Sequence, residues 1–241
     1  MDLTGKVAVI TGASRGLGAG MARVAQDEGM SLALCSRGAP ALTPSDRVLC
    51  ERLDVTDPSA MQAFATAAFT RFGQIDLWVN NAGLLEPVGP LRDAPPEDFA
   101  RLIEVNVVGV ALGSRAYARL LHEHGGRGVL LNVSSGAARK PYFGWSGYCA
   151  SKAAVDRMSE VIALEESERL RVHAVAPGVV ESEMQATLRE KDEDTFRDVQ
   201  RFRKLHEDRA LQSPEQAGEK LLRLAFDPDA RREEVCVDVR S

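Results

Sequence analysis

The chain contains 241 residues, of which 44% are hydrophobic and 27% are charged, and it carries a net charge of −5. These values are typical of a globular α/β protein, and the negative charge gives no electrostatic reason to expect nucleic acid or an anionic membrane as a partner. The longest apolar runs are far too short to span a membrane as a helix.

Short apolar segments rich in β-branched residues alternate with longer amphipathic segments along the chain. The short segments predict strands at 6–11, 31–36, 48–53, 76–80, 128–133 and 171–175, and a short closing strand at 235–239. The longer segments predict helices at 17–28, 58–72, 97–122, 147–167 and 214–226. Apolar strands separated by helices indicate a parallel sheet that is covered on both faces. The sequence therefore predicts one α/β domain over 1–241, a doubly wound parallel sheet of the Rossmann type.

A charged insertion at 181–212 interrupts this alternation before the last strand. Within it, four apolar residues fall at helical spacing under a shell of charged side chains: Phe196, Val199, Phe202 and Leu205. This pattern predicts either a surface helix with a narrow apolar stripe or a helical lid over the substrate, and the sequence leaves both interpretations open.

A glycine-rich loop, Thr11–Gly18, follows the first predicted strand and opens a helix. Gly12 permits a tight turn, Gly16 lets the backbone approach a pyrophosphate, and Gly18 allows close packing of helix on strand. The N–H groups and dipole at the helix start favour anionic phosphates. We therefore expect this loop to bind a dinucleotide, with Ser14, Arg15 and Leu17 as further contacts.

The end of the second predicted strand bears on the choice of cofactor. Enzymes selective for NAD usually carry an acidic residue there, which binds the ribose 2′-hydroxyl. This chain has Ser36 instead, and Arg37 and Arg15 supply positive charge for a 2′-phosphate. The pattern predicts NADP(H) as the cofactor; the alternative is that both arginines are ordinary surface residues.

Two further segments complete the predicted cofactor site. Asp54 and Val55 follow the third strand, where the carboxylate can accept a hydrogen bond from an adenine amino group; the alternative role for Asp54 is to cap the start of a loop. Asn81, Ala82 and Gly83 follow the fourth strand, at the carboxyl edge where ligands bind in such sheets.

Ser135, Tyr148 and Lys152 carry the predicted chemistry. Tyr148 and Lys152 are four residues apart, so on a helix they lie on the same face. A nearby ammonium favours the phenolate, and we expect it to lower the tyrosine pKa from its ordinary value of about 10. Ser135, in the turn after a strand, reaches the same substrate oxygen. The three residues predict proton transfer to a carbonyl or from an alcohol.

Together these residues closely resemble the motifs of the short-chain dehydrogenase/reductase family, in the family's order and spacing over nearly the whole chain. The matching positions are Thr11–Gly18, Asp54, Asn80–Gly83, Asn106, Ser135, Tyr148, Lys152 and Pro177 to Ser182. The resemblance implies Tyr148 as the general acid/base and Ser135 as the group that orients the carbonyl. It also implies that Lys152 lowers the tyrosine pKa and binds the nicotinamide ribose, and that Asn106 holds a water linking Lys152 to solvent.

The same resemblance assigns the segment after the sixth strand to the nicotinamide. It implies that Ser182 and the backbone of Val180 contact the cofactor near the nicotinamide amide, within a segment that also contains Pro177 and Gly178. Of the adjacent serines only Ser135 has the family's spacing to Tyr148, so Ser134 is interpreted as structural.

The carboxyl-terminal third looks like the sepiapterin reductase and benzil reductase branch of that family. In this branch, the resemblance places Asp238 where it would anchor a pterin amino group; the alternative is a solvated residue paired with Arg240. The chain lacks the Val-Asp-Gly-Gly-like turn of many relatives, which favours a homodimer, through the helices beginning near 97 and 147, over a tetramer. Aromatic residues between the catalytic serine and tyrosine suggest an aromatic dicarbonyl substrate: Tyr142, Phe143 and Trp145; the alternative is that they pack the loop.

The leading interpretation is an NADPH-dependent carbonyl reductase with Tyr148 as proton donor. One alternative is an NADP-binding regulator or scaffold without turnover, but such proteins usually lose a member of the Asn–Ser–Tyr–Lys set. Another is an epimerase or dehydratase, which the chain length and glycine spacing disfavour. Scattered cysteines without C-x-x-C spacing and the lack of a signal-peptide pattern favour a reduced, cytoplasmic protein, and no metal site is predicted.

Overall fold

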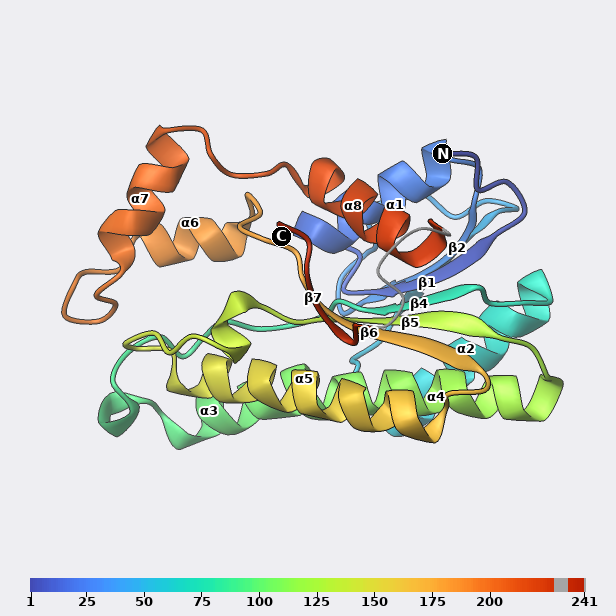
Figure 1. The fold of residues 1–241 in the computed structure, drawn as a ribbon, viewed down its shortest axis with the longest axis horizontal. Coiled ribbons are helices and arrows are strands. Elements are labelled where there is room, and N and C mark those ends of the chain that lie inside the picture. The colour runs from blue at the N-terminus through green and yellow to red at the C-terminus, as the bar shows by residue number, and fades with distance from the viewer. Residues whose placement is uncertain (228–233, 241) are drawn as a thin grey trace.

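The computed structural model describes residues 1–227 and 234–240. Its described residues form a seven-stranded sheet, parallel throughout, with the strand order β3-β2-β1-β4-β5-β6-β7 (Figure 1). The order reverses direction between β1 and β4, as in a doubly wound sheet. The predicted fold class is therefore confirmed. The strands are β1 Val7–Thr11, β2 Ser31–Ser36, β3 Val48–Arg52, β4 Leu77–Asn80, β5 Gly128–Val133, β6 Leu170–Ala176 and β7 Cys236–Asp238.

Helices cover both faces of the sheet (Figure 1). One layer contains α1 (Gly16–Asp27) and α8 (Pro214–Phe226), and the opposite layer contains α2 (Pro58–Phe72), α4 (Gly109–His124) and α5 (Ser146–Glu165). Side-chain caps mark the start of two of these helices. Asp57 caps α2 through its carboxylate, and Ser213 forms a capping box with Gln216 at the start of α8. Within the described part of the chain, no helix is long and apolar enough to cross a membrane.

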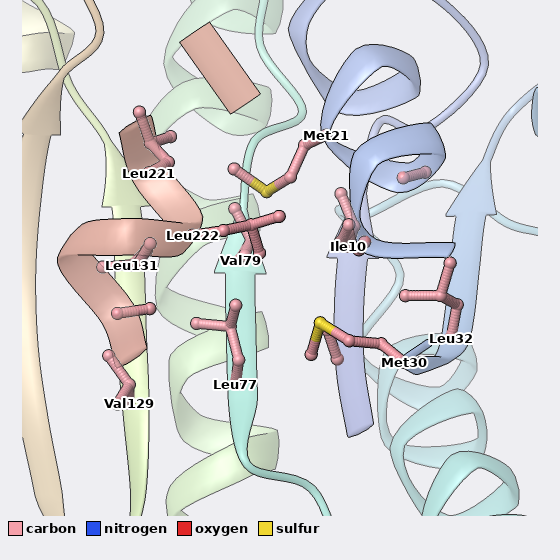
Figure 2. Close-up of a cluster of buried hydrophobic side chains, with 14 of the residues drawn as sticks. Ile10, Met21, Met30, Leu32, Leu77, Val79, Val129, Leu131, Leu221 and Leu222 are labelled. Carbon is pink, nitrogen blue, oxygen red and sulfur yellow. The ribbon is translucent and has the colours of Figure 1, made fainter. Parts of the chain in front are cut away.

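The core lies on both sides of the central strands, because alternate residues of a strand point to opposite faces. On β1, Ile10 packs with Met21 of α1 and Leu222 of α8 (Figure 2), whereas Val9 packs in the cluster under α2 and α4. All five residues of β1 are buried. This double burial explains why the strands are continuous apolar runs in the sequence.

The helix predicted over 97–122 is interrupted in the structure. It consists of α3 (Pro96–Ile103), a π-helical turn (Glu104–Val108) and α4. A π turn inserts one extra residue into a helix and is found mostly at functional sites. Here the turn contains Asn106, whose side chain is fully buried. The prediction of helical structure was right, but the periodicity gave no sign of the turn.

The insertion at 181–212 forms two short helices, α6 (Glu183–Arg189) and α7 (Val199–Glu207) (Figure 1). Phe196 precedes α7, so the expectation of one helix spanning all four apolar residues was wrong. Backbone hydrogen bonds join the two ends of the insertion: Glu181 N–H donates to Gln212 O (2.9 Å), and Gln212 N–H donates to Val179 O (3.1 Å). The stripe does not face solvent, because Phe196 and Val199 are fully buried.

Candidate active site

A cleft of about 820 Å³ lies at the carboxyl ends of the strands. Loops that follow successive strands line it, as expected at the carboxyl edge of a doubly wound sheet. Most residues of the predicted cofactor site line this cleft: Gly12, Ser14, Arg15, Gly16, Leu17, Ser36, Arg37, Asp54, Val55, Asn81, Ala82, Gly83, Pro177, Gly178, Val180 and Ser182. Five of the predicted catalytic and substrate residues join them: Ser135, Tyr142, Trp145, Tyr148 and Lys152.

The glycine-rich loop has the geometry that its sequence predicts. Gly12 has a φ of +67°, and a Cβ there would lie 2.7 Å from the Cα of Ala82. Gly18 does not line the cleft, and a Cβ there would meet Asn81 and the carbonyl oxygen of Gly12. Asn81 fixes the loop, because its side-chain amide donates to the carbonyl oxygens of Thr11 (2.9 Å) and Gly12 (3.1 Å). Glycines are therefore required for close approach at both positions.

Arg15, Ser36 and Arg37 line the end of the cleft where the sequence predicts the ribose of the cofactor, which we term the nucleotide end. The Ser36 hydroxyl donates to the carbonyl oxygen of Gly38 (2.9 Å), and Arg37 is exposed at the turn after β2. Arg15 forms an ion pair with Glu183, the first residue of α6. Both partners are two-thirds exposed. This exposed pair links the glycine-rich loop to the insertion. An ion pair so exposed to water contributes little to the free energy of folding.

Asp54 caps the loop after β3, which is one of the two roles that the sequence left open; its contact with adenine stays a prediction. It lines the cleft, but one carboxylate oxygen accepts from the N–H (3.0 Å) and hydroxyl (2.8 Å) of Thr56, and the other pairs with Arg101. Partial burial raises the pKa of Asp54, yet the Thr56 hydrogen bonds and the Arg101 charge outweigh it, so the pKa falls below its ordinary value. The carboxylate caps the loop after β3 and stays ionised.

Tyr148 lies in the first turn of α5 and is buried in the cleft wall beside Ser135. Ser135 begins a short 3-10 turn, where its hydroxyl accepts from the N–H of Ala137 (3.2 Å). Burial raises the pKa of Tyr148 to about 12, against the opposing effect of a hydrogen bond with Ser135. The expected lowering of the tyrosine pKa is therefore wrong for this structure, because desolvation of the phenolate dominates.

Lys152 lies one turn further along α5, as the spacing predicts. Its ammonium is 5.6 Å from the centroid of the Tyr148 ring and donates to the carbonyl oxygen of Val133 (2.8 Å). Burial lowers the pKa of Lys152 to about 8, and the charge of Asp156 acts in the opposite direction. Tyrosine and lysine are thus both shifted by desolvation, each toward its neutral form.

Asn106 does not line the cleft but supports the cleft wall from behind. Its side-chain amide donates to the carbonyl oxygen of Leu84 (2.9 Å) and the hydroxyl of Ser151 (3.1 Å), and its oxygen accepts from Leu84 N–H (2.7 Å). These bonds join the π turn to α5 and to the loop after β4. The predicted role in holding a water stays a prediction.

Ser134 has the structural role that its spacing suggested. Its hydroxyl donates to the carboxylate of Asp156 on α5, and its side chain is almost completely buried. The two adjacent serines therefore contact different residues of α5: Ser134 bonds to Asp156, and Ser135 faces Tyr148.

Aromatic side chains line the end of the cleft that contains Ser135 and Tyr148, which we term the substrate end because the sequence predicts the substrate there. Trp145 stacks on Phe196 at 4.7 Å between ring centroids, and lies 5.0 Å from Tyr142 and 5.2 Å from Tyr148. Phe202 of α7 completes the group at 5.8 Å from Trp145. The apolar stripe of the insertion thus packs on the aromatic residues that precede α5, and α6 and α7 form one side of the cleft.

Two predicted substrate residues are placed elsewhere. Phe143 lies outside the cleft lining, with the Arg197 guanidinium 4.1 Å from its ring centroid. Asp238 is also outside the lining, and its carboxylate accepts hydrogen bonds from Nε (2.9 Å) and Nη2 (2.6 Å) of Arg240. The pairing with Arg240 that the sequence offered as the alternative is therefore present, and the predicted contact with substrate stays a prediction.

Sequence reasoning missed two arginines that line the cleft, Arg201 of α7 and Arg240 after β7. The only signal for Arg240 was its possible pairing with Asp238, because β7 ends at Asp238 and Arg240 lies in the turn that follows. Arg201 had none, because its place depends on how α7 folds back. No cluster of histidine, cysteine, aspartate or glutamate suited to a metal occurs in the described residues.

Comparison with known proteins is consistent with this geometry. A family model described as short chain dehydrogenase matches residues 6–193. The chain is 33% identical over 215 residues to a benzil reductase ((S)-benzoin forming) of Bacillus subtilis, covering 86% of this chain and 88% of that protein. It is 34% identical over 226 residues to a benzil reductase ((S)-benzoin forming) of Saccharomyces cerevisiae, covering 87% and 86%.

A solved structure extends the likeness to three dimensions. The 3-ketoacyl-(acyl-carrier-protein) reductase of Brucella melitensis, solved in complex with NADH, superposes with a TM-score of 0.82 at 30% identity, covering 99% of this chain and 98% of that one. Fold, cleft and sequence agree in one conclusion. The chain belongs to the short-chain dehydrogenase family, and it is an oxidoreductase of the kind that uses nicotinamide cofactors.

Proposed function

We propose that this protein reduces aromatic ketones or dicarbonyls with NADPH, with Tyr148 as the proton donor. The observation that carries the proposal is the position of Tyr148, which lies between Ser135 and the aromatic side chain of Trp145 in the wall of the cleft. A carbonyl oxygen beside the tyrosine and serine hydroxyls would place an aryl substituent against the Trp145 ring. Aromatic rings prefer such stacked or edge contacts.

The cleft fits a nicotinamide dinucleotide. Gly12 and Gly18 leave room for a close backbone approach at the start of α1, where N–H groups favour a pyrophosphate. Gln185 lines the cleft, and its buried side-chain oxygen has no hydrogen-bond partner within the described protein. When bound, the reduced cofactor supplies the hydride; the residues of this chain position it and handle the proton.

The shifted pKa of Tyr148 suits the reductive direction. With a pKa of about 12 the phenol is protonated at neutral pH and available as an acid. Ser135 orients the carbonyl oxygen, and the nearby Lys152 ammonium stabilises the negative charge that the tyrosine acquires as it donates its proton. We propose these roles for the three side chains.

Two observations support NADPH rather than NADH. Ser36 stands where a carboxylate would bind a free 2′-hydroxyl, and Arg37 is exposed beside it in the cleft. Arginine guanidinium groups are well suited to a phosphate. Arg15 adds a second positive charge on the same side of the cleft, although Glu183 shares it.

We further propose a cytoplasmic homodimer, joined through the α4 and α5 layer. Val108, Val161 and Leu164 are large apolar side chains exposed there, with Leu164 79% exposed. Exposed apolar side chains on these helices are candidate contacts for such an interface. The four cysteines are free, as is usual in a reducing compartment. Sedimentation velocity tests the dimer: Leu164→Glu should give a monomer, and a wild-type monomer would contradict the proposal.

The direct test of function is NADPH oxidation in the presence of benzil, 1-phenylpropane-1,2-dione, a pterin and simple aldehydes. We expect turnover of the aromatic dicarbonyls, at higher kcat/KM with NADPH than with NADH. Absence of turnover with every carbonyl compound, while NADPH still binds, would instead indicate a cofactor-binding regulator.

A further inference from the structure

Two arginines, Arg201 and Arg240, line the substrate end of the cleft. Arg201 of α7 donates a hydrogen bond from Nη1 to the Tyr142 hydroxyl (3.3 Å). Arg240, after β7, has Nη2 3.6 Å from the point that a Cβ on Gly136 would occupy. Gly136 directly follows Ser135. The two guanidinium groups come from elements far apart in the sequence, and both line the cleft.

Each of the two guanidinium groups has N–H donors left for a ligand. Asp238 binds Nε and Nη2 of Arg240, which fixes the plane of the guanidinium but leaves Nη1 without a hydrogen-bond partner among the described residues. Arg201 forms no ion pair with any carboxylate in the part of the chain that the structure describes. Arg201 and Arg240 are each exposed to the solvent of the cleft.

The acidic residues along the cleft do not neutralise this end. Asp54 is paired with Arg101, Glu183 with Arg15, and Glu86 with Lys191 (2.9 Å). Each lining carboxylate therefore already has its own cation. The substrate end retains positive charge from Arg201, and from Arg240 only the part that Asp238 does not offset.

We propose that the substrate carries a carboxylate, which binds between Arg201 and Arg240, so that the enzyme reduces aromatic 2-oxo acids. The proposal rests on the reductase function proposed above. The aryl group would contact Tyr142 and Trp145, and the ketone would face Ser135 and Tyr148. Arginine donates to carboxylates in a planar, often bidentate manner, and such charge-assisted hydrogen bonds are strong.

The 2-oxo position follows from the neighbourhood of Arg240. Its guanidinium approaches Gly136, the residue after the serine that orients the ketone, so the carboxylate must be close to the reacting carbonyl. In the reaction the ketone carbon gains the hydride of the reduced nicotinamide, and the ketone oxygen gains the proton of Tyr148. The carboxylate is unchanged, and the products are a 2-hydroxy acid and the oxidised nicotinamide.

A matched pair of substrates tests the proposal. Phenylglyoxylate and 1-phenylpropane-1,2-dione have similar shapes, but one has a carboxylate where the other has an acetyl group. Arg201→Gln and Arg240→Gln should each lower kcat/KM for phenylglyoxylate about tenfold or more, mainly through KM, since a hydrogen bond to a charged group contributes ~1.5–3 kcal/mol. The same variants should change kcat/KM for the dione much less.

Arg197→Gln is the matched control. Arg197 lies in the same insertion as Arg201 but outside the cleft lining, over the ring of Phe143. It should leave the kinetics of both substrates unchanged. The KM for NADPH should also be unchanged in all three variants, because Arg15 and Arg37 lie at the nucleotide end.

Three results would overturn the proposal while leaving the reductase function intact: reduction of the dione but not of phenylglyoxylate by the wild type, equal losses for both substrates in the arginine variants, or a raised KM for NADPH in those variants. Equal losses for both substrates would mean that the two arginines have a structural role. A raised KM for NADPH would mean that they contact the cofactor. If neither substrate is reduced, the proposed function fails, and calorimetric titration of phenylglyoxylate into the protein with NADP⁺ decides the site. Binding that the double variant loses would support the carboxylate site, and no binding would overturn it.

Discussion

The Lys152 ammonium donates a hydrogen bond of 2.8 Å to the carbonyl oxygen of Val133, the last residue of β5. The bond ties the first half of α5 to the strand whose following turn carries Ser135. It also holds the ammonium in a buried position, where desolvation lowers the pKa of Lys152 to about 8. Burying this charge therefore costs free energy of folding.

Stability should increase when the Lys152 charge is removed. At pH 7 the lysine is protonated in both states, and only the folded state buries the charge. Between about pH 8 and 10.5 the unfolded chain binds more protons than the folded one. The destabilisation by the buried Lys152 charge therefore disappears as the pH rises. We expect Lys152→Met to raise Tm at pH 7, even though it gives up the bond to Val133.

Thermal unfolding at pH 7 and above pH 10.5 checks this prediction. The gain in Tm should be largest below pH 8 and should vanish at the higher pH, where the wild-type lysine is neutral in both states. A destabilised Lys152→Met protein at pH 7 would show that the hydrogen bond to Val133 outweighs the buried charge.

Tyr148→Phe should remove the proton donor while keeping the ring between Ser135 and Trp145. We expect turnover to fall by at least about a hundredfold, the usual low limit for loss of a general acid. NADPH binding, measured by fluorescence titration, should be nearly unchanged. Near-normal turnover would show that another group donates the proton.

Tyr117→Phe is the control for that experiment. Tyr117 of α4 is fully buried, but its hydroxyl donates to the carbonyl oxygen of Ile75 (2.8 Å), and it does not line the cleft. Losing this bond should lower the free energy of unfolding by about 1 kcal/mol. Turnover should not change.

Cofactor choice should depend on Ser36 and Arg37. We expect Arg37→Ala to weaken the preference for NADPH over NADH by about tenfold, because a charge-assisted bond to the 2′-phosphate is lost. Ser36→Asp should reverse the preference, since the new carboxylate repels the phosphate and accepts from a free 2′-hydroxyl. Titrating both cofactors measures the ratio, with Arg47→Ala as a surface control outside the cleft. Equal affinities in the wild type would mean that Arg37 is merely solvated.

Asp238→Asn distinguishes the two roles considered for this residue. Because both carboxylate oxygens bond to Arg240, we expect kcat/KM for a pterin and for a neutral aromatic diketone to keep the same ratio. Steady-state kinetics with both substrates gives that ratio. A sharp rise of KM for the pterin alone would establish the substrate contact that the sequence suggested.

The sequence by itself determined the sheet, the glycine-rich loop and the candidate catalytic residues that the structure brings together in the cleft. These features depend on local rules: β-branched runs form buried strands, Gly12 and Gly18 are required where no Cβ fits, and the four-residue spacing of Tyr148 and Lys152 sets one face of a helix. Most of the cofactor residues follow strand ends, and the carboxyl ends of parallel strands meet at one edge. Their gathering in one cleft was therefore predictable.

Tertiary structure alone decided the properties that depend on neighbours far along the chain. The spacing predicted a lowered tyrosine pKa, yet burial raises it, because the energy of a charge depends on how completely the surrounding protein excludes water. The same holds for Phe143, which the chain directs away from the cleft, and for Arg201, which α7 brings to it. Many long-range contacts together determine where these side chains lie, and no local pattern of residues predicts it.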